Sequence, residues 1–589
     1  MEPVEIEQPT PPPEGGGDPA VAPSHGGPPR RQVSNITLPK KKSGITGACS
    51  NLVNSIVGAG IIGIPFALSQ SGLIAGIVLL LLVSYFTDKT LRMLVELASF
   101  SPRLKGHGVL TFEDMLSLPY GRFGTIFVLT SMFITAYGAM VAYLLIIKDT
   151  LPVVFGLEDE VGTGSFVERE VLMIATSLVI VVPLSMQRDF SSLAKTSLLS
   201  VIADILLVIF IAVFSPVKSS VENAGGIGEV IKKNAVNGKG FFVGFGVLTI
   251  AMTCQHSAFI VAGSLDNITS KRWATVTCIS LTISAILCLI LGVFGYLGFL
   301  DETQGDILNN FNDDPKANVA RVLLAITMFF TYPMEAFVAR HVLVQLIWGG
   351  DMDGKVTTTN LSTGESSTTK AKMLGCLNRR HLVTIGIYIM TLIPALIVDD
   401  LGPVLSITGA IGGCCLAYIG PGLAYLGVHG DSFLAWVTDI VYSKNSKTQS
   451  RKTSSAVLEG DLPVEGDATA NLPDMNGSRP TSLSTAGPKP WWWWPTFMPI
   501  WVAIASTGAR GMNERLMDLE QSHGGPQTMS PTNQAENGDT TEETEVVGAR
   551  KRDYFFSMFF ILFGIVALVA GIISNIYVQV NDIFYTPTR

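Results

Sequence analysis

The first long apolar segment, residues 46–68, is long enough to cross a bilayer as a helix but is poorly suited to a continuous one. Gly58 and Gly60 lower its helix propensity, and Pro65 removes a backbone donor. Asn54 adds a polar side chain at membrane depth. Backbone groups freed by a break are tolerated there only where they are buried in protein or line a cavity. The segment therefore predicts a helix that breaks near the bilayer midplane, a feature typical of substrate sites in secondary transporters.

Two other interpretations of these glycines are open. Small residues along one helix face could simply let a neighbouring helix pack closely. The stretch Gly58–Gly63 also matches G-x-G-x-x-G, but a nucleotide site needs a soluble strand before the glycines and a soluble helix after them. Because these glycines lie inside an apolar run, the pattern does not favour nucleotide binding.

Composition places the chain among polytopic membrane proteins, since 48% of its 589 residues are hydrophobic and 15% are charged. Residues 1–43 are rich in Pro and Gly and contain no apolar core, so we expect a disordered cytosolic tail and no cleavable signal peptide. The first membrane helix would then direct targeting. No cysteine falls in a loop expected outside, so we predict no external disulfide.

Hydrophobic patterning predicts eleven transmembrane helices, ten of them within a core at 44–430 and the last at 554–580. Lys and Arg accumulate in every second loop and in the N-terminal tail. The loop at 215–240 is an exception with four lysines, but the balance still favours a cytosolic N-terminus. An odd number of spans then places residues 581–589 outside the cell or in a lumen. The apolar segments lie near 46–68, 72–97, 123–147, 170–186, 192–214, 241–263, 273–299, 318–348, 381–398, 402–428 and 554–580.

Residues 431–553 form a long insertion before the last span, and most of it is rich in Ser, Thr, Pro and Gly. We expect this part to be disordered and cytosolic. A Trp-rich segment, 491–505, interrupts it and is too short to span a bilayer. Since tryptophan prefers the headgroup region, we interpret the segment as an interfacial helix, with a docking patch for a partner as the alternative.

Four segments together resemble the amino acid/auxin permease family, and in particular the sodium-coupled neutral amino acid transporters and the vacuolar amino acid transporters. The similarity covers about 43–430 and 554–580 and leaves the insertion outside. In the sixth span, Gln255 is inserted into the family's Cys-His pattern. The segments are Asn51–Pro65, Cys254-Gln-His256-Ser-Ala-Phe-Ile with Gly263-Ser-Leu, Thr331–His341, and Gly409-Ala-Ile-Gly with Gly420-Pro421-Gly.

The resemblance implies an all-α integral membrane fold with a five-plus-five inverted repeat, broken first and sixth helices, and an additional eleventh helix. The sequence supports the second break independently. The sixth span is apolar except for four polar residues in its middle, and polar interruptions at corresponding positions of two halves point to a binding site. These residues are Thr253, Gln255, His256 and Ser257.

A break in the first span would begin a new half-helix at Gly60, whose free N–H groups and positive dipole suit an α-carboxylate. Carbonyl groups on the other side of the break could accept from an α-ammonium group. No charge lies in the middle of spans one, three or six, so a neutral substrate side chain fits best. The expected substrate-binding residues are Ser55, Ile56, Val57, Gly58, Ala59, Gly60, Thr253 and His256.

His256 has three interpretations: a structural residue that holds the two halves by bonding a backbone carbonyl of span one, a titrating group that couples transport to pH, or a substrate contact. A metal site is not expected, because no second ligand lies at helical spacing.

Two sites compete for the coupling ion. Asn54 and Thr331 could bind sodium together with the Phe329 carbonyl, which Pro333 frees from its helix bond. These positions match the family's sodium site between the first and eighth spans. The alternative for Thr331 is ordinary hydrogen bonding back to its own helix.

Asp204 lies within the fifth span and is the proton-coupling candidate, because an ionisable group at membrane depth is functional by default. Its alternative is a structural hydrogen bond to Ser197 or Ser200. Glu335 and Arg340 in the eighth span are interpreted as a gate or a structural pair.

These patterns predict a secondary active transporter of amino acids, neutral ones by preference, that works by alternating access coupled to sodium or protons. We expect a monomer in the plasma membrane or a vacuolar or lysosomal membrane, with no cofactor besides the coupling ion and no nucleic-acid partner. A nutrient sensor that binds amino acids and signals through its cytosolic segments is the first alternative. A membrane-embedded enzyme is the second, but no nucleophile–base pair and no ATP-binding motif support it.

Overall fold

The computed structural model describes residues 44–101, 103–104, 111–157, 166–187, 197–311, 315–349, 355–359, 366–370, 372–374, 377–439, 494–522 and 550–585. The predicted tail at 1–43, much of the 431–553 insertion and residues 586–589 lie outside this part of the chain.

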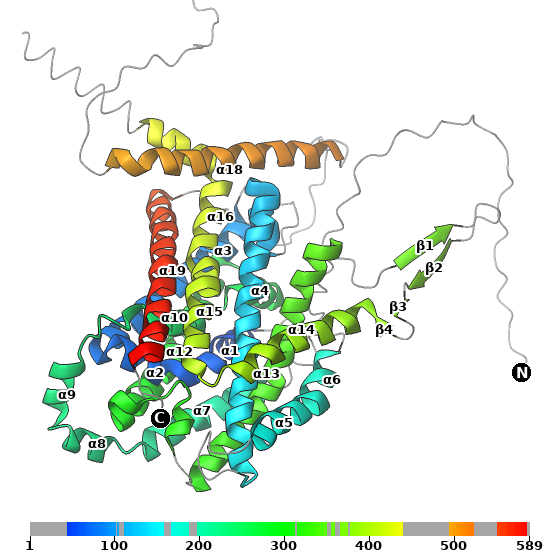
Figure 1. Cartoon of the computed structure of the whole chain (residues 1–589). Coiled ribbons are helices and arrows are strands. Elements are labelled where there is room, and N and C mark those ends of the chain that lie inside the picture. The colour runs from blue at the N-terminus through cyan, green and yellow to red at the C-terminus, as the bar shows by residue number, and fades with distance from the viewer. Residues whose placement is uncertain are drawn as a thin grey trace, which may run out of the picture. The chain divides into compact units, whose positions relative to one another are not determined.

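A bundle of long helices forms the core of the described chain (Figure 1). Its first half contains α1 (Ile45–Ile56), η1 (Ala59–Gly63), α2 (Ile64–Ser71), α3 (Leu73–Phe100), α4 (Phe112–Val154), α5 (Phe166–Thr176), the π-helical η2 (Ser177–Val181), α6 (Val182–Ser185), α7 (Ser197–Phe214), α8 (Val217–Asn223) and α9 (Ile227–Asn234). Its second half contains α10 (Phe241–Met252), α11 (Gln255–Ser264), α12 (Ser270–Phe299), η4 (Leu300–Glu302), η5 (Ile307–Asn310), α13 (Pro315–Trp348), α14 (Arg379–Ile397), α15 (Leu401–Thr408), the π-helical η6 (Gly409–Gly413) and η7 (Cys415–Ile419), and α16 (Gly420–Val428). Helices α18 (Trp494–Ser522) and α19 (Lys551–Tyr585) follow.

Eight helices in the described residues are long and apolar enough to cross a membrane, and ten if each of two bent pairs forms one span. The predicted fourth span corresponds to α5, η2 and α6, which are helical from Phe166 to Ser185 but are not among those ten. A charged start, Glu168-Arg169-Glu170, shortens its apolar part. The chain is therefore a helical, multi-pass membrane protein.

The first span breaks where the glycines predict. Helix α1 ends at Ile56, and the first span resumes with a bend of 52°. Val57 (φ −84°, ψ 58°) and Gly58 (φ −95°, ψ −147°) leave helical geometry, and a 3₁₀ turn, η1, leads into α2 with Pro65 in its first turn. Proline is tolerated at that position because the first N–H groups of a helix have no partner within it.

The sixth span breaks at Thr253 and Cys254, between α10 and α11. Thr253 has ψ 115° and Cys254 has φ −137°, so both residues leave the helix. Gln255 is fully buried and satisfies a backbone group freed there, since its Oε1 accepts from the Cys254 N–H at 3.1 Å. Its Nε2 donates to Thr90 Oγ1 of α3 at 3.2 Å and so fixes the amide.

Helix α10 packs tightly against the first span just beyond its break. A Cβ on Gly60 would lie 2.5 Å from Ala251 Cα of α10. A Cβ on Gly63 would lie 2.6 Å from the Leu405 side chain of α15. Close helix packing therefore accounts for the small size of both glycines.

Short strands lie between α13 and α14 in the sequence and do not change the all-helical class of the membrane fold. They pair antiparallel as two hairpins, β1 with β2 and β3 with β4. Their bounds are Lys355–Thr359 (β1), Ser366–Lys370 (β2), Lys372–Leu374 (β3) and Leu377–Asn378 (β4).

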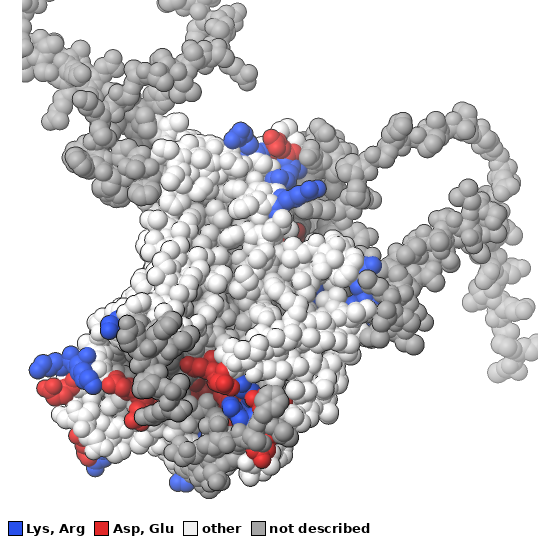
Figure 2. Space-filling model, in the orientation of Figure 1, with Lys and Arg blue, Asp and Glu red and all other residues white. Residues whose placement is uncertain are grey.

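Helix α18 crosses one end of α4 and α16 (Figure 1), which we call the α18 end. Gly508 meets Gly427 at this crossing, where a Cβ on Gly508 would lie 2.6 Å from Gly427 Cα. Arg515 donates to the Leu118 carbonyl at 2.5 Å, beside a turn in α4 where Gly121 has φ 63°. The described part of the predicted Trp-rich segment, 494–505, lies in the first turns of α18. Figure 2 shows Asp and Glu side chains gathered at the opposite end of the bundle.

Candidate functional site

A direct hydrogen bond joins the two broken spans at their breaks. Ser55 Oγ in the last turn of α1 lies 2.6 Å from Ser257 Oγ in the first turn of α11, and both side chains are half-buried. The Ser257 hydroxyl also donates to the Cys254 carbonyl at 2.9 Å, within the second break. The two breaks therefore form one polar region inside an apolar bundle, with hydroxyl groups that can donate or accept.

His256 lies next to this bond and faces α13. Its Nε2 is 3.6 Å from Glu335 Oε1, and the two side chains are only 11% and 15% exposed. This separation exceeds that of a direct hydrogen bond, so the imidazole ring and the carboxyl group face each other without bonding directly. The His256 Nδ1 is buried and has no hydrogen-bond partner in the described chain. His256 thus connects the sixth span to the eighth while leaving one ring nitrogen for another ligand.

The predicted Glu335–Arg340 pair is wrong. Arg340 is buried and donates instead to the Ser185 carbonyl at 2.7 Å and to Thr384 Oγ1 at 2.9 Å. Residues five apart on a helix point in different directions, which explains why Glu335 faces His256 while Arg340 faces α6 and α14.

The other predicted substrate residues bring backbone groups and packing surfaces to the breaks rather than free polar side chains. Ile56 and Val57 are buried, and a Cβ on Gly58 would lie 3.5 Å from the Tyr143 hydroxyl, which is ordinary contact. The Ala59 side chain lies outside the described residues. The Thr253 hydroxyl donates to the Thr249 carbonyl of its own helix at 2.6 Å.

The two predicted sodium ligands, Asn54 and Thr331, lie on different helices, α1 and α13. No hydrogen bond between these two helices is found among the described residues. Asn54 is buried in α1, with 7% exposure. Thr331 is half-buried in α13, and its hydroxyl donates to the Thr327 carbonyl at 2.7 Å, which is the back-bonding alternative. Helix α7 packs against both α1 and α13.

Asp204 lies on α7, the helix that contacts α1, α12 and α13. Its side chain is 2% exposed, and Oδ2 has no hydrogen-bond partner among the described residues. The predicted structural hydrogen bond to Ser197 or Ser200 is not observed. Ser200 makes no hydrogen bond to Asp204 Oδ2, and the Ser197 side chain is outside the described residues. An incompletely satisfied carboxylate at membrane depth favours a functional role.

A second buried polar cluster lies at the end opposite α18, and sequence reasoning missed it. Lys148 is fully buried and donates to Asp399 at 2.9 Å, and Asp149 accepts from Arg169 at 2.9 Å. Asp306, in the loop after α12, is fully buried near them, and desolvation raises its pKa to about 7. The signal in the sequence was the Lys148-Asp149 pair at the end of an apolar span.

Comparison with known proteins agrees with this architecture. The family described as transmembrane amino acid transporter protein matches residues 41–441. A rat protein whose name assigns it to sodium-coupled neutral amino acid transporters, as member 11, is 28% identical over 405 residues, covering 67% of this chain and 82% of its own. The cattle protein of the same name is 30% identical over 385 residues, covering 64% and 75%. Vacuolar amino acid transporter 2 of Saccharomyces cerevisiae is 29% identical over 387 residues, covering 65% and 76%.

These relatives are named as transporters, and the matched family is not a family of enzymes. The match covers more than half of the chain and includes both broken spans. The expected resemblance is confirmed: this chain belongs to the amino acid/auxin permease family of transmembrane amino acid transporters.

Proposed function

We propose that this protein is a secondary active transporter of amino acids that works by alternating access. The observation that carries the proposal is the pair of broken spans joined at their breaks by Ser55 and Ser257. Two interrupted helices that meet inside an apolar bundle supply free backbone groups and hydroxyls where a zwitterion needs them. The resemblance and the names of the relatives support the same substrate class.

The α-carboxylate would bind at the start of the half-helix after the first break. The Gly60 N–H has no backbone acceptor in the described chain, and the helix dipole favours negative charge at this position. The α-ammonium group would bind carbonyl oxygens at the end of α1, with the Ser55 and Ser257 hydroxyls beside it. Both ends of the zwitterion would then be recognised without a fixed protein charge in spans one and six.

A neutral substrate side chain fits the electrostatics best. The structure adds an acidic group, Glu335, to the site, and its Oε1 lies 3.6 Å from His256 Nε2. Because Glu335 already faces His256, an additional charged side chain from the substrate would lack a partner of its own in low dielectric. The proposed specificity is therefore for neutral amino acids.

The proposed transport cycle uses a five-plus-five inverted repeat with an eleventh helix. Under this arrangement, the halves before and after α10 rock against each other while the two breaks stay near the midplane. Helices α5, η2 and α6 would form the fourth span of the first repeat. The accumulation of Lys and Arg in alternate loops supports a cytosolic N-terminus and a cytosolic α18 end, in a plasma membrane or a vacuolar or lysosomal membrane.

Sodium is the proposed coupling ion, at Asn54 and Thr331. The Thr331 hydroxyl donates its proton to Thr327, yet its oxygen keeps lone pairs that can bind a cation. The names of the rat and cattle relatives also support sodium. Protons are the competing choice, and the buried Asp204 carboxylate supports it.

Counterflow in proteoliposomes tests the function. Purified full-length protein would be reconstituted with an unlabelled amino acid inside, and uptake of each member of a radiolabelled panel would be followed. We expect accelerated entry of one group of neutral amino acids. Saturable binding without any counterflow would contradict transport and would indicate a sensor that uses the same site.

A further inference from the structure

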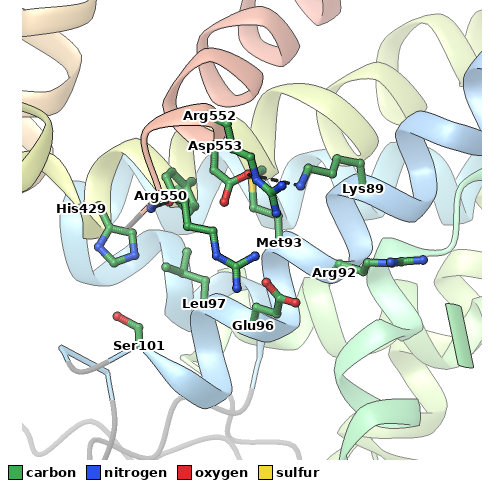
Figure 3. Close-up of a pocket in the computed structure, with 11 residues that line it drawn as sticks. Lys89, Arg92, Met93, Glu96, Leu97, Ser101, His429, Arg550, Arg552 and Asp553 are labelled. Carbon is green, nitrogen blue, oxygen red and sulfur yellow. Dashed lines mark hydrogen bonds and ion pairs between the residues drawn. The ribbon is translucent and has the colours of Figure 1, made fainter. Parts of the chain in front are cut away.

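A polar pocket lies at the α18 end, away from the broken spans. Its volume is about 110 Å³, and it is formed by the last turns of α3, the end of α16 and the start of α19 (Figure 3). Lys89, Arg92 and Glu96 line it from α3, while Arg550 and Asp553 line it from the start of α19. The pocket therefore lies where two membrane-spanning helices reach one surface of the bundle.

Two groups in this pocket lack partners in the described chain. Ser101 is 1% exposed, and its Oγ is buried without a hydrogen bond. The Arg550 backbone N–H donates to the Tyr425 hydroxyl at 3.1 Å, which fixes this residue at the pocket. No hydrogen bond or ion pair to the Arg550 guanidinium is found within the described residues, and Figure 3 shows this group pointing toward Leu97 and Glu96. A buried donor and a free guanidinium together leave hydrogen-bonding capacity for a ligand.

The other charged groups in the pocket are largely paired. Lys89 lies 3.2 Å from Asp553, and Arg92 lies 2.7 Å from Asp88. Glu96 accepts a hydrogen bond from Ser270 at 2.7 Å.

His429, which also lines the pocket, adds no positive charge at neutral pH. Desolvation, with a smaller contribution from Arg103, lowers its pKa to about 4. Arg552 lies at the rim, 64% exposed and 3.7 Å from Asp553. The positive charges of Arg550 and Arg552 together exceed the negative charge of Glu96. The pocket therefore keeps a surplus of positive charge that favours an anion.

We propose that this pocket binds the phosphate group of an anionic phospholipid headgroup. The residues 550–552 form a basic run immediately before the last membrane span, a pattern that attracts anionic lipids. Phe555 and Phe559 follow on the exposed face of α19, 45% and 44% exposed, where acyl chains would lie. A planar guanidinium recognises phosphate oxygens in pairs, and the Ser101 hydroxyl can donate to a further oxygen.

Titration with short-chain lipids tests the proposal on the purified full-length protein in detergent. The probe is dioctanoyl phosphatidylinositol 4-phosphate. Dioctanoyl phosphatidylcholine is the zwitterionic, net-neutral comparison, and inositol 1,4-bisphosphate is the soluble source of the same phosphate chemistry. Tryptophan fluorescence reports binding. We expect saturable binding of the phosphoinositide, at least roughly tenfold tighter than of either comparison, because the apolar contacts of its acyl chains and the charged hydrogen bonds of its phosphate groups add together.

Matched variants separate the pocket from general surface charge. Arg550→Gln should weaken phosphoinositide binding by roughly tenfold. Lys551→Gln removes the same charge from the neighbouring residue, which is exposed like Arg550 but does not line the pocket, and should leave binding within about twofold. Ser101→Ala removes a hydroxyl that has no partner in the described chain, so it should fold normally and still weaken binding several-fold.

Three results would overturn the proposal. Equal losses in Arg550→Gln and Lys551→Gln would mean that the lipid follows surface charge alone. Unchanged binding in both Arg550→Gln and Ser101→Ala would exclude the pocket. Binding of inositol 1,4-bisphosphate as tight as that of the lipid would assign the pocket to a soluble phosphate compound instead.

Discussion

Gly60→Ala should destabilise the protein and impair transport, whereas Gly58→Ala should do much less. A Cβ at residue 60 would lie 2.5 Å from Ala251 Cα and 2.8 Å from Ala251 Cβ. Atoms cannot approach so closely, so α10 must shift away from the first span. Overpacking of this kind costs about 1–3 kcal/mol. At Gly58 the new Cβ would meet only the Tyr143 hydroxyl at 3.5 Å, and a cost below about 1 kcal/mol is expected.

Thermal unfolding in detergent and initial counterflow rates would measure both effects. The Gly60→Ala midpoint should fall below that of Gly58→Ala, and its transport rate should fall further, because Ala251 lies two residues before the break at Thr253. A Gly60→Ala protein with the stability and rate of the wild type would refute the packing argument. Equal losses of stability and rate in the two variants would also refute it, since the new Cβ meets Ala251 at 2.5 Å in one variant and the Tyr143 hydroxyl at 3.5 Å in the other.

Three further outcomes are expected. Burial raises the pKa of Asp306 to about 7, against about 4 in an unfolded chain, so the folded protein holds a proton that the unfolded chain releases. Stability should therefore fall as pH rises from about 4 to about 7, and Asp306→Asn should flatten this part of a melting profile; an unchanged slope would contradict it. In a sodium-coupled protein, Thr331→Ala should raise the sodium concentration for half-maximal rate, while sodium-independent uptake that Asp204→Asn abolishes would instead support protons. Deleting 445–485 should leave counterflow intact, because the composition of this segment cannot form a core; an inserted but inactive protein would show otherwise.

The positions of both breaks could be predicted from the sequence. Gly58 and Gly60 interrupt the first span, and the polar residues at 253–257 interrupt the sixth, so local chemistry alone marks each interruption. The side chains that meet at the two breaks could not be paired in the same way. Ser55 and Ser257 are 202 residues apart, and their contact depends on how each helix is rotated about its axis.

Apolar periodicity does not determine that rotation when a helix is hydrophobic on all sides. The prediction that Glu335 pairs with Arg340 has a different cause, since residues five apart on one helix point in different directions, whereas the approach of Glu335 to His256 does depend on helix rotation. Gln255 looked like an insertion in a motif, yet its amide caps the break by accepting from Cys254. A long polar side chain next to an interrupted helix was the available signal.

Substrate counterflow in serine variants tests the central claim most directly, because the claim is that the two breaks form one substrate site. Ser55→Ala and Ser257→Ala should each raise the half-saturating substrate concentration by roughly tenfold, since each removes a hydrogen bond to a charged group. The double variant should be little worse than either single one, because the two hydroxyls contact each other at 2.6 Å and act as a unit. Ser69→Ala is the matched control, since that hydroxyl donates only within α2, to the Phe66 carbonyl at 2.8 Å. Wild-type affinity in both single variants, or an equal loss in Ser69→Ala, would contradict the account.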